Sequence, residues 1–178
     1  MFRQELVALG AINPRRVAGS AVDNRTGKAM NKEIRHSFLI NASPEAIMDA
    51  LMQEARIRQW WTREAKVEDG HGILGWSGYG WTVELNMEQD VDAQRVVWNC
   101  IKSNMQNTNA WEGTKITFTL TPAIQGTRLD FAQTEYRESP CYEVCNQGWA
   151  FFVGTSLKQY LETGKGMPYP EMLDTRKA

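Results

Sequence analysis

The stretch CYEVCNQGWAFFVGTSLKQYLE, residues 141–162, decides the fold of this 178-residue chain. Its apolar residues recur at spacings of three and four, the pattern of a helix with one buried face. They are Cys145, Trp149, Phe152, Val153, Leu157, Tyr160 and Leu161. Ser139-Pro140 before the stretch and Gly164 after it are typical of helix ends. Burial of such a stripe stabilises a fold by roughly 10 kcal/mol, so we expect this long helix to dock on a sheet.

The region before the helix, residues 64–136, has the alternating pattern of antiparallel strands. The clearest run is 81–88, where apolar Trp81, Val83 and Leu85 alternate with polar residues. Comparable runs lie at 95–102, 116–121 and 128–131, with shorter candidates at 65–68 and 73–76. Each strand has one polar and one apolar face, which predicts a sheet covered on one side.

One more strand and two short helices precede this meander. Apolar and polar residues alternate over 34–41, which predicts the strand. Ser43 is suited to cap a helix and Pro44 to occupy its first position. An apolar stripe over 47–55 then predicts a helix, and residues 56–61 predict a second, shorter one.

This order of elements resembles the α+β helix-grip fold of the START and birch-allergen (SRPBCC) superfamily. Four short motifs carry the resemblance: INASPEAI at 40–47, IRQWW at 57–61, WEGTKITF with GTRL at 111–129, and the segment 148–164. The last is similar to the terminal helix of the bacterial homologues of the heat-shock ATPase activator. The resemblance covers about residues 32–168. It implies a curved antiparallel sheet wrapped around the long C-terminal helix, with an apolar cavity between them.

We divide the chain into an N-terminal extension, 1–30, a helix-grip ligand-binding domain, 31–166, and a C-terminal tail, 167–178. The extension holds five basic and two acidic residues. A basic arm and an Arg-rich targeting peptide are two interpretations, and we adopt a third, a loosely ordered extension. In the chaperone activator that the resemblance brings in, a separate N-terminal domain supplies much of the partner contact. Thirty residues are not expected to replace it.

Composition disfavours several classes of partner. The net charge is -1, so the Lys/Arg excess that binds nucleic acid or an anionic membrane is missing. No apolar run approaches the roughly 20 residues of a membrane span, and we expect a cytoplasmic protein. Three cysteines without a CxxC pair and two distant histidines indicate neither a disulfide framework nor a metal site. We expect no cofactor.

Aromatic residues are the main candidates for ligand binding. The expected ligand-binding residues are Trp60, Trp61, Trp76, Trp81, Trp98, Trp149, Phe152, Val153 and Phe131, and Trp111 is the seventh tryptophan of the chain. Indole rings that line a cavity stack on planar ligands. In the alternative interpretation the same rings pack on one another and fill the core.

Strand alternation adds a polar group to these candidates. If Phe38 and Phe131 point inward, then His36, Gln133 and Glu135 do so as well. The resemblance implies that the first and last strands are neighbours, so the three side chains would meet at one end of the cavity. They would orient a ligand or transfer a proton. The alternative places them at strand ends, in contact with water.

Two further features carry open alternatives. The glycine-rich segment 70–80 lacks a phosphate-binding motif and is either a cavity lid bearing Trp76 and Tyr79 or a set of tight turns. Cys141 and Cys145 lie four residues apart at the start of the long helix, where a thiol pKa is lowered. We prefer the interpretation that they are small buried apolar residues.

The sequence thus predicts a protein that binds a small apolar or aromatic molecule between sheet and long helix. We identify no catalytic residue, because no Ser/His/Asp or Cys/His system and no paired carboxylates are evident. A cofactor-free cyclase or isomerase using the same cavity is an alternative, and an inward His36 bonded to Glu135 would favour it. Another is a chaperone-interacting regulator or homodimer, which needs an exposed apolar patch.

Overall fold

The computed structural model describes residues 32–137 and 139–176, so the prediction for residues 1–30 lies outside the described residues. The elements are β1 Lys32–Ile40, α1 Pro44–Met52, α2 Glu54–Trp60, β2 Glu64–Glu68, β3 His71–Trp76, η2 Ser77–Tyr79, β4 Trp81–Asp90, β5 Arg95–Ser103, η3 Met105–Asn107, β6 Lys115–Ala123, β7 Gly126–Tyr136, α3 Tyr142–Phe151, η4 Phe152–Leu157, α4 Lys158–Thr163 and η5 Glu171–Arg176.

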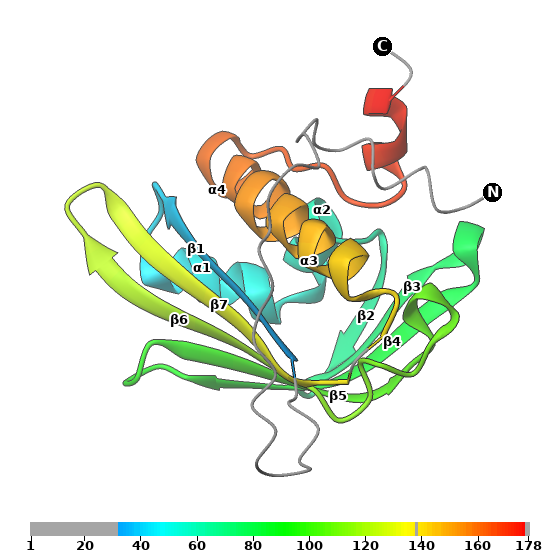
Figure 1. Ribbon diagram of the computed structural model, residues 1–178. Helices are drawn as coiled ribbons and strands as arrows, with labels where there is room; N and C mark the ends of the chain where they lie inside the picture. Colours follow the sequence, from blue (N-terminus) through cyan, green and yellow to red (C-terminus); the bar gives the residue numbers. More distant parts are fainter. Residues whose placement is uncertain (1–31, 138, 177–178) are drawn as a thin grey trace, which may run out of the picture.

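The seven strands form one antiparallel sheet in the order β1-β7-β6-β5-β4-β3-β2. The sheet curves, and the C-terminal helix lies across its concave face (Figure 1). Strands β1 and β7 pair directly, with His36 opposite Phe131 and Ile34 opposite Gln133. The predicted fold class, a helix-grip α+β fold with two short helices after the first strand, is confirmed.

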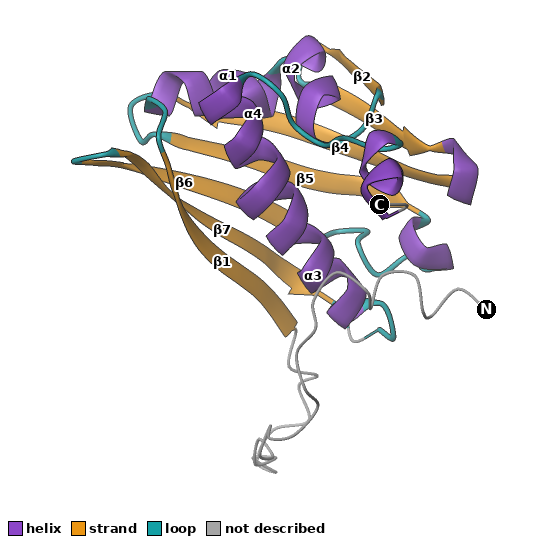
Figure 2. Ribbon diagram, turned by 90° about the horizontal axis from the view of Figure 1, so that it is seen from above, coloured by secondary structure: helices purple, strands orange, loops and turns teal. Residues whose placement is uncertain are grey.

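The long helix predicted over 141–162 is present as α3, η4 and α4 without a break. Its middle segment, η4, is π-helical, which inserts one residue into the regular period. Gly154 lies in this segment, and a Cβ at its position would overlap the ring of Phe38 on β1. The helix therefore approaches β1 closely because one residue has no side chain. Figure 2 shows it running diagonally over the sheet.

The first short helix begins at Pro44, as the sequence indicates, but it ends at Met52, and the second begins at Glu54, two residues before its predicted start. The Ser43 Oγ accepts a hydrogen bond from the Ala46 N–H at 3.2 Å, and Pro44 is the first helical residue. In α2, the buried Trp60 donates its indole N–H to the Ala50 carbonyl at 2.9 Å, which ties the helices together. Trp61 then carries the chain toward the sheet.

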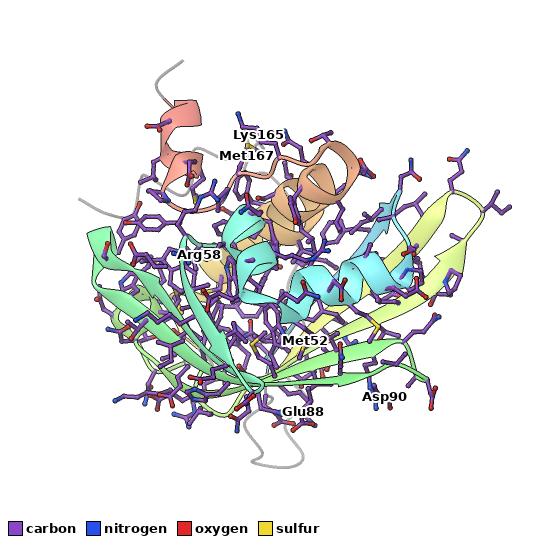
Figure 3. All side chains as sticks on the ribbon, turned by 180° about the vertical axis from the view of Figure 1, so that it is seen from behind. Met52, Arg58, Glu88, Asp90, Lys165 and Met167 are labelled. Carbon is purple, nitrogen blue, oxygen red and sulfur yellow. The ribbon has the colours of Figure 1, made fainter. Side chains whose placement is uncertain are left out.

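Side chains fill most of the space between the helices and the sheet (Figure 3). In this view Met52 lies between helix and sheet, whereas Glu88 and Asp90 of β4 lie on the outer side. The core includes stacked indoles, with the rings of Trp98 and Trp61 5.2 Å apart and those of Trp60 and Trp61 5.7 Å apart. Much of the interior is thus closely packed.

The C-terminal segment, expected to be a tail outside the domain, packs on it. Tyr169 and Met172 are buried and belong to the hydrophobic core. The backbone of Tyr169 donates to the Trp61 carbonyl and accepts from the Arg63 N–H, both at 2.9 Å. Arg63 also pairs with Glu171 at 2.6 Å. These contacts hold the segment around Tyr169 against the fold, on the far side of the predicted boundary at residue 166.

Candidate functional site

A pocket lies where the start of α3 meets the β3–η2–β4 hairpin and the C-terminal segment. Its volume is about 80 Å³, it is partly open to solvent, and its walls are mainly apolar. The lining residues are Trp61, Trp76, Tyr79, Trp81, Met105, Gln106, Trp111, Val144, Cys145, Gly148, Trp149, Phe152, Tyr169 and Met172. Figure 2 shows these elements gathered at the end of the sheet where α3 begins.

Trp149 forms the wall between the pocket and the core. Its ring stacks on Trp111 with 5.3 Å between centroids and lies 5.1 Å from that of Trp61. The Trp149 indole N–H donates to Gln133 Oε1 at 2.8 Å, and Gln133 Nε2 donates to Thr114 Oγ1 at 3.0 Å. Because the ring has both stacking and hydrogen-bond partners, its orientation in the wall is fixed.

The opposite wall comes from the hairpin and the C-terminal segment. The Tyr169 hydroxyl accepts a hydrogen bond from the Gly78 N–H at 2.8 Å. Tyr79 stacks on Trp81 with 4.5 Å between ring centroids and lies 5.9 Å from the Tyr169 ring. The glycine-rich segment thus contains β3, η2 and the turn before β4, and it carries aromatic side chains at the pocket.

The predicted ligand-binding residues separate into those at the pocket and those in the core. Trp61, Trp76, Trp81, Trp149 and Phe152 line the pocket. The others that are fully or almost fully enclosed in the core are Trp60, Trp98, Phe131, Gln133 and Val153. Trp60 and Trp98 each stack on the ring of Trp61, as in the alternative interpretation in which the rings pack on one another.

The expected cluster of His36, Gln133 and Glu135 does not form. Gln133 points inward as predicted, but Glu135 is exposed. The register changes here, because Lys32 pairs with Tyr136 while Ile34 pairs with Gln133, so β7 carries one extra residue. Glu135 adopts a positive φ of 61° in this bulge. The prediction that Glu135 faces the cavity was wrong, because the bulge turns Tyr136 inward instead.

His36 is half-buried under the long helix rather than at the pocket. Its Nε2 lies 3.2 Å from the Asn146 carbonyl oxygen, and its ring lies 5.7 Å from that of Phe38. Gln133 reaches Trp149 and Thr114, so it positions an aromatic wall. A hydrogen bond between His36 and Glu135 in a cavity would have favoured a cyclase or isomerase. In the structure His36 instead contacts the Asn146 carbonyl, and Glu135 is exposed.

A thiol cluster borders the pocket at the N-terminal end of α3. Around Cys141 Sγ lie the hydroxyls of Tyr136 at 3.0 Å, Ser139 at 3.1 Å and Thr108 at 3.6 Å. A hydrogen bond from Cys145 is the main cause that lowers the pKa of Cys141 to about 5, with the hydroxyls helping and burial opposing. The same hydrogen bond, together with burial, raises the pKa of Cys145.

Several lining residues were missed, for identifiable reasons. Cys145 shares the helical spacing of Trp149 and Phe152, so the sequence held a signal for its direction. Met105 and Gln106 lie in an irregular connection without periodicity. Tyr169 and Met172 follow the last predicted element, where no pattern indicates that the chain returns to the pocket.

Metal sites and membrane-spanning helices were also considered in the part of the chain that the structure describes. Among residues 32–137 and 139–176, no group of three or more His, Cys, Asp or Glu side chains is placed to hold a metal ion. Nor does that part of the chain contain a helix with the length and apolarity needed to cross a membrane.

Solved structures include several similar proteins. The solution structure of the Aha1 dimer from Colwellia psychrerythraea has a TM-score of 0.63 and 29% identity, covering 76% of this chain and 99% of that one. Protein MLL2253 from Mesorhizobium loti has a TM-score of 0.58 and 23% identity over 74% of this chain and 97% of that one. Protein SSP2350 from Staphylococcus saprophyticus has a TM-score of 0.58 and 18% identity over 76% and 95%. The last two likenesses concern the fold alone.

A comparison with curated proteins found no match. A family model, in contrast, matches residues 41–162, which extend from the connection after β1 to the end of the long helix and include most of the pocket walls. With more than half of its length matched, the chain belongs to the family described as Activator of Hsp90 ATPase homolog 1-like protein.

Proposed function

We propose that this protein binds a small, planar, largely apolar molecule in the pocket between α3, the β3–η2–β4 hairpin and the C-terminal segment. The observation that carries the proposal is the pocket itself, a space of about 80 Å³ with mainly aromatic walls. A single water needs roughly 10–15 Å³, so this space is several times larger than a solvent site.

We place the protein in the cytoplasm. Its three cysteines, Cys100, Cys141 and Cys145, are free thiols, which suits a reducing compartment.

The chemistry of the walls supports an aromatic ligand. Trp61, Trp111 and Trp149 present rings that are already packed against one another, so they lose little freedom on binding. Among the described residues that line the pocket there is no histidine and no acidic or basic side chain. Binding by stacking and by burial of apolar surface is thus favoured over recognition of a charged ligand.

Gly148 offers a sharp test because it lies in the pocket wall on α3. A Cβ added there meets no atom within 4 Å, so a larger side chain enters the pocket without a clash at the backbone. We expect 2-naphthol to bind the protein saturably at one site, as measured by calorimetry. Gly148→Leu should weaken this binding at least tenfold, with the melting temperature unchanged or raised.

Gly148→Ala is the matched control, since it adds one methyl group and should leave much of the pocket volume. Equal affinity in wild type and Gly148→Leu would contradict the proposal, as would a failure of the wild type to bind any of a series of planar ring compounds. Native mass spectrometry of protein purified from its own host would identify a retained ligand directly.

A second function is supported by the family description, which names an activator of the Hsp90 ATPase. Such a regulator needs an accessible protein-binding surface, and Ile73 on β3 and Ile101 on β5 are large apolar side chains that are nearly half exposed. A pulldown with purified Hsp90 at modest salt tests this role. Retention that is lost in the double variant Ile73→Ser/Ile101→Ser but kept in Gly148→Leu would favour it over small-molecule binding.

A further inference from the structure

Two buried side-chain polar atoms in the described part of the chain have no hydrogen-bond partner, and both are indole nitrogens. They belong to Trp81 and Trp98. Trp98 is fully enclosed in the core, whereas Trp81 is one of the residues that line the pocket. A buried donor without an acceptor lowers the stability of a protein, and most such groups are paired. For Trp81, the pocket is the place from which the missing acceptor can come.

Two other indoles of the pocket wall use their N–H groups within the protein. Trp111 donates to Cys145 Sγ at 3.3 Å, and Trp149 donates to Gln133 Oε1 at 2.8 Å. These rings offer a ligand their apolar faces but no unused donor. Trp81 differs from them, because its N–H remains available for an acceptor that a ligand supplies.

The side-chain amide of Gln106 is a second unused polar group in the pocket wall. Gln106 lines the pocket and is half-buried, and its amide forms no hydrogen bond within residues 32–137 and 139–176. Its backbone has a φ of 56°, a left-handed conformation that residues other than glycine keep only where the surrounding structure holds them. The amide is therefore held at the pocket at a cost in backbone strain.

Asn104 holds the segment of Gln106 next to Trp81. The Asn104 Oδ1 accepts a hydrogen bond from the Thr82 N–H at 2.7 Å, and its Nδ2 donates to the Gly80 carbonyl at 3.0 Å. Its backbone N–H also donates to the Thr82 carbonyl at 3.2 Å. These bonds engage the residues before and after Trp81, so the two unused polar groups come from adjacent segments of the pocket wall.

We propose that the pocket selects planar aromatic molecules that carry a carbonyl group, whose oxygen accepts hydrogen bonds from the Trp81 N–H and the Gln106 amide. The proposal rests on the proposed function, because the rings of the ligand must first occupy the pocket. An indole N–H only donates, so the ligand must supply an acceptor, and a carbonyl oxygen has two lone pairs for two donors. Tyr79 covers one face of the Trp81 ring, so the ligand approaches the other face or the edge.

The hydration of the carbonyl group decides the direction of the expected preference. A carbonyl loses its hydrogen bonds to water when it enters an apolar pocket, so without donors it weakens binding. Donors in the wall replace these bonds, and pairing the enclosed Trp81 N–H adds a gain that a hydrocarbon ligand does not have. We therefore expect the pocket to prefer a ketone over a hydrocarbon of the same shape.

2-Acetylnaphthalene and 2-isopropenylnaphthalene are matched probes, because a methylene group in the second replaces the carbonyl oxygen of the first. In calorimetric titrations we expect the wild type to bind the ketone at least about fivefold more tightly. Trp81→Phe should remove most of this preference, and Gln106→Met should reduce it. Trp76→Phe, the same substitution at the residue that pairs with Trp81 in the sheet, should retain it. The ratio of the two affinities is compared, because loss of ring area weakens both probes.

The indole N–H resonances of the wild type give a second measurement that does not depend on the folding of a variant. The Trp81 proton should move downfield when 2-acetylnaphthalene binds, but not when 2-isopropenylnaphthalene binds. Since both probes have the same rings, their ring-current effects largely cancel in the comparison. The unpaired N–H of Trp98 in the core is the internal control and should respond equally to both probes.

The outcomes separate this inference from the proposed function. Equal affinities of the wild type for the two probes would overturn the inference while ligand binding stands. The same conclusion follows if the preference survives in Trp81→Phe or Gln106→Met, if Trp76→Phe loses it equally, or if both probes shift the Trp81 proton alike. If neither probe binds and 2-naphthol does not bind either, the proposed function fails, and this inference fails with it.

Discussion

Gln133 is a polar side chain that is tolerated in the core because both the oxygen and the nitrogen of its amide form hydrogen bonds. Its oxygen accepts from Trp149 and its nitrogen donates to Thr114, so its burial leaves no polar atom of these contacts unpaired. A hydrogen bond of this kind stabilises the fold by about 0.5–1.5 kcal/mol, whereas an unpaired buried partner costs about 1–3 kcal/mol.

Replacing Gln133 with leucine should therefore lower the free energy of unfolding by about 1–3 kcal/mol, because the Trp149 N–H loses its acceptor. Urea denaturation measures this loss, and near-UV circular dichroism reports the change at Trp149. Gln89→Leu, the same substitution at an exposed position of β4, is the matched control and should stay within about 0.5 kcal/mol of wild type. Similar effects at both positions would show that Gln133 does not hold the ring.

Cys141 should give the protein a measurable pH dependence. Its pKa is lowered to about 5 from an ordinary value near 9, so the folded state holds a thiolate where the unfolded state holds a thiol. The resulting stability is complete above about pH 9 and is lost as the pH falls through about 5.

Thiolate absorbance at 240 nm should rise between about pH 4 and 6 in wild type and be missing in Cys141→Ser. The stability difference between the two proteins should grow from pH 5 toward pH 8. The neighbouring titratable groups, Cys145 and Tyr136, have raised pKa values and keep their protons over this range. A transition only above pH 8 would contradict the thiolate assignment.

Among the elements, the long helix carries two glycines with opposite surroundings. Gly148 faces open space in the pocket, whereas Gly154 lies against the ring of Phe38 in the π-helical segment. The first glycine leaves part of the pocket unfilled, and the second allows the helix to approach β1. The same residue type thus keeps a pocket open at one position and permits close packing at the other.

The two glycines should respond to alanine with opposite signs. Gly148→Ala should raise the free energy of unfolding by about 0.5–1 kcal/mol, because alanine loses less backbone entropy in a helix. Gly154→Ala should lower it by about 1–3 kcal/mol, since the added methyl group displaces Phe38. Thermal unfolding of both variants checks the pair, and a shift of the same sign in each would show that helix propensity alone decides.

Regular strands and helices were predicted from the sequence, whereas irregularities within them were not. Alternation predicted the strands and helical spacing predicted the long helix, because these periods report a buried face directly. The β7 bulge at Glu135 and the π-helical segment each add one residue to a regular period. Neither has a periodic signal of its own, so the direction of Glu135 was predicted wrongly.

At the scale of the whole molecule, the pocket depends on segments far apart in the chain. Trp61 follows α2, Trp111 lies in the connection between β5 and β6, and Tyr169 follows the long helix. Five of the aromatic candidates, Trp61, Trp76, Trp81, Trp149 and Phe152, line this pocket, and their role in ligand binding stays a prediction. The return of the chain after residue 166 to form a wall was not predicted, because a contact between distant irregular segments leaves no local pattern.

Tyr169 should be the residue whose removal opens the pocket. Tyr169→Ala removes a buried ring and should lower the free energy of unfolding by about 3–5 kcal/mol while weakening the binding of 2-naphthol. Tyr169→Phe retains the ring and loses only the hydroxyl that accepts from Gly78, so it should cost about 0.5–1.5 kcal/mol and keep the affinity. Calorimetric titration of both variants, compared with unfolding, would reveal whether the wall contributes to binding.

The bulge in β7 has a consequence for comparing relatives. With Gln133 and Tyr136 both buried, the strand before the bulge and the strand after it follow different alternations. A homologue one residue shorter at this point would turn the position of Tyr136 toward solvent and leave its counterpart of Cys141 without that phenol. We therefore expect the lowered pKa of the thiol at the position of Cys141 in those homologues that keep three residues between the buried glutamine and the buried tyrosine positions, counted from Gln133 to Tyr136. The identity of the other residues in the strand should matter less.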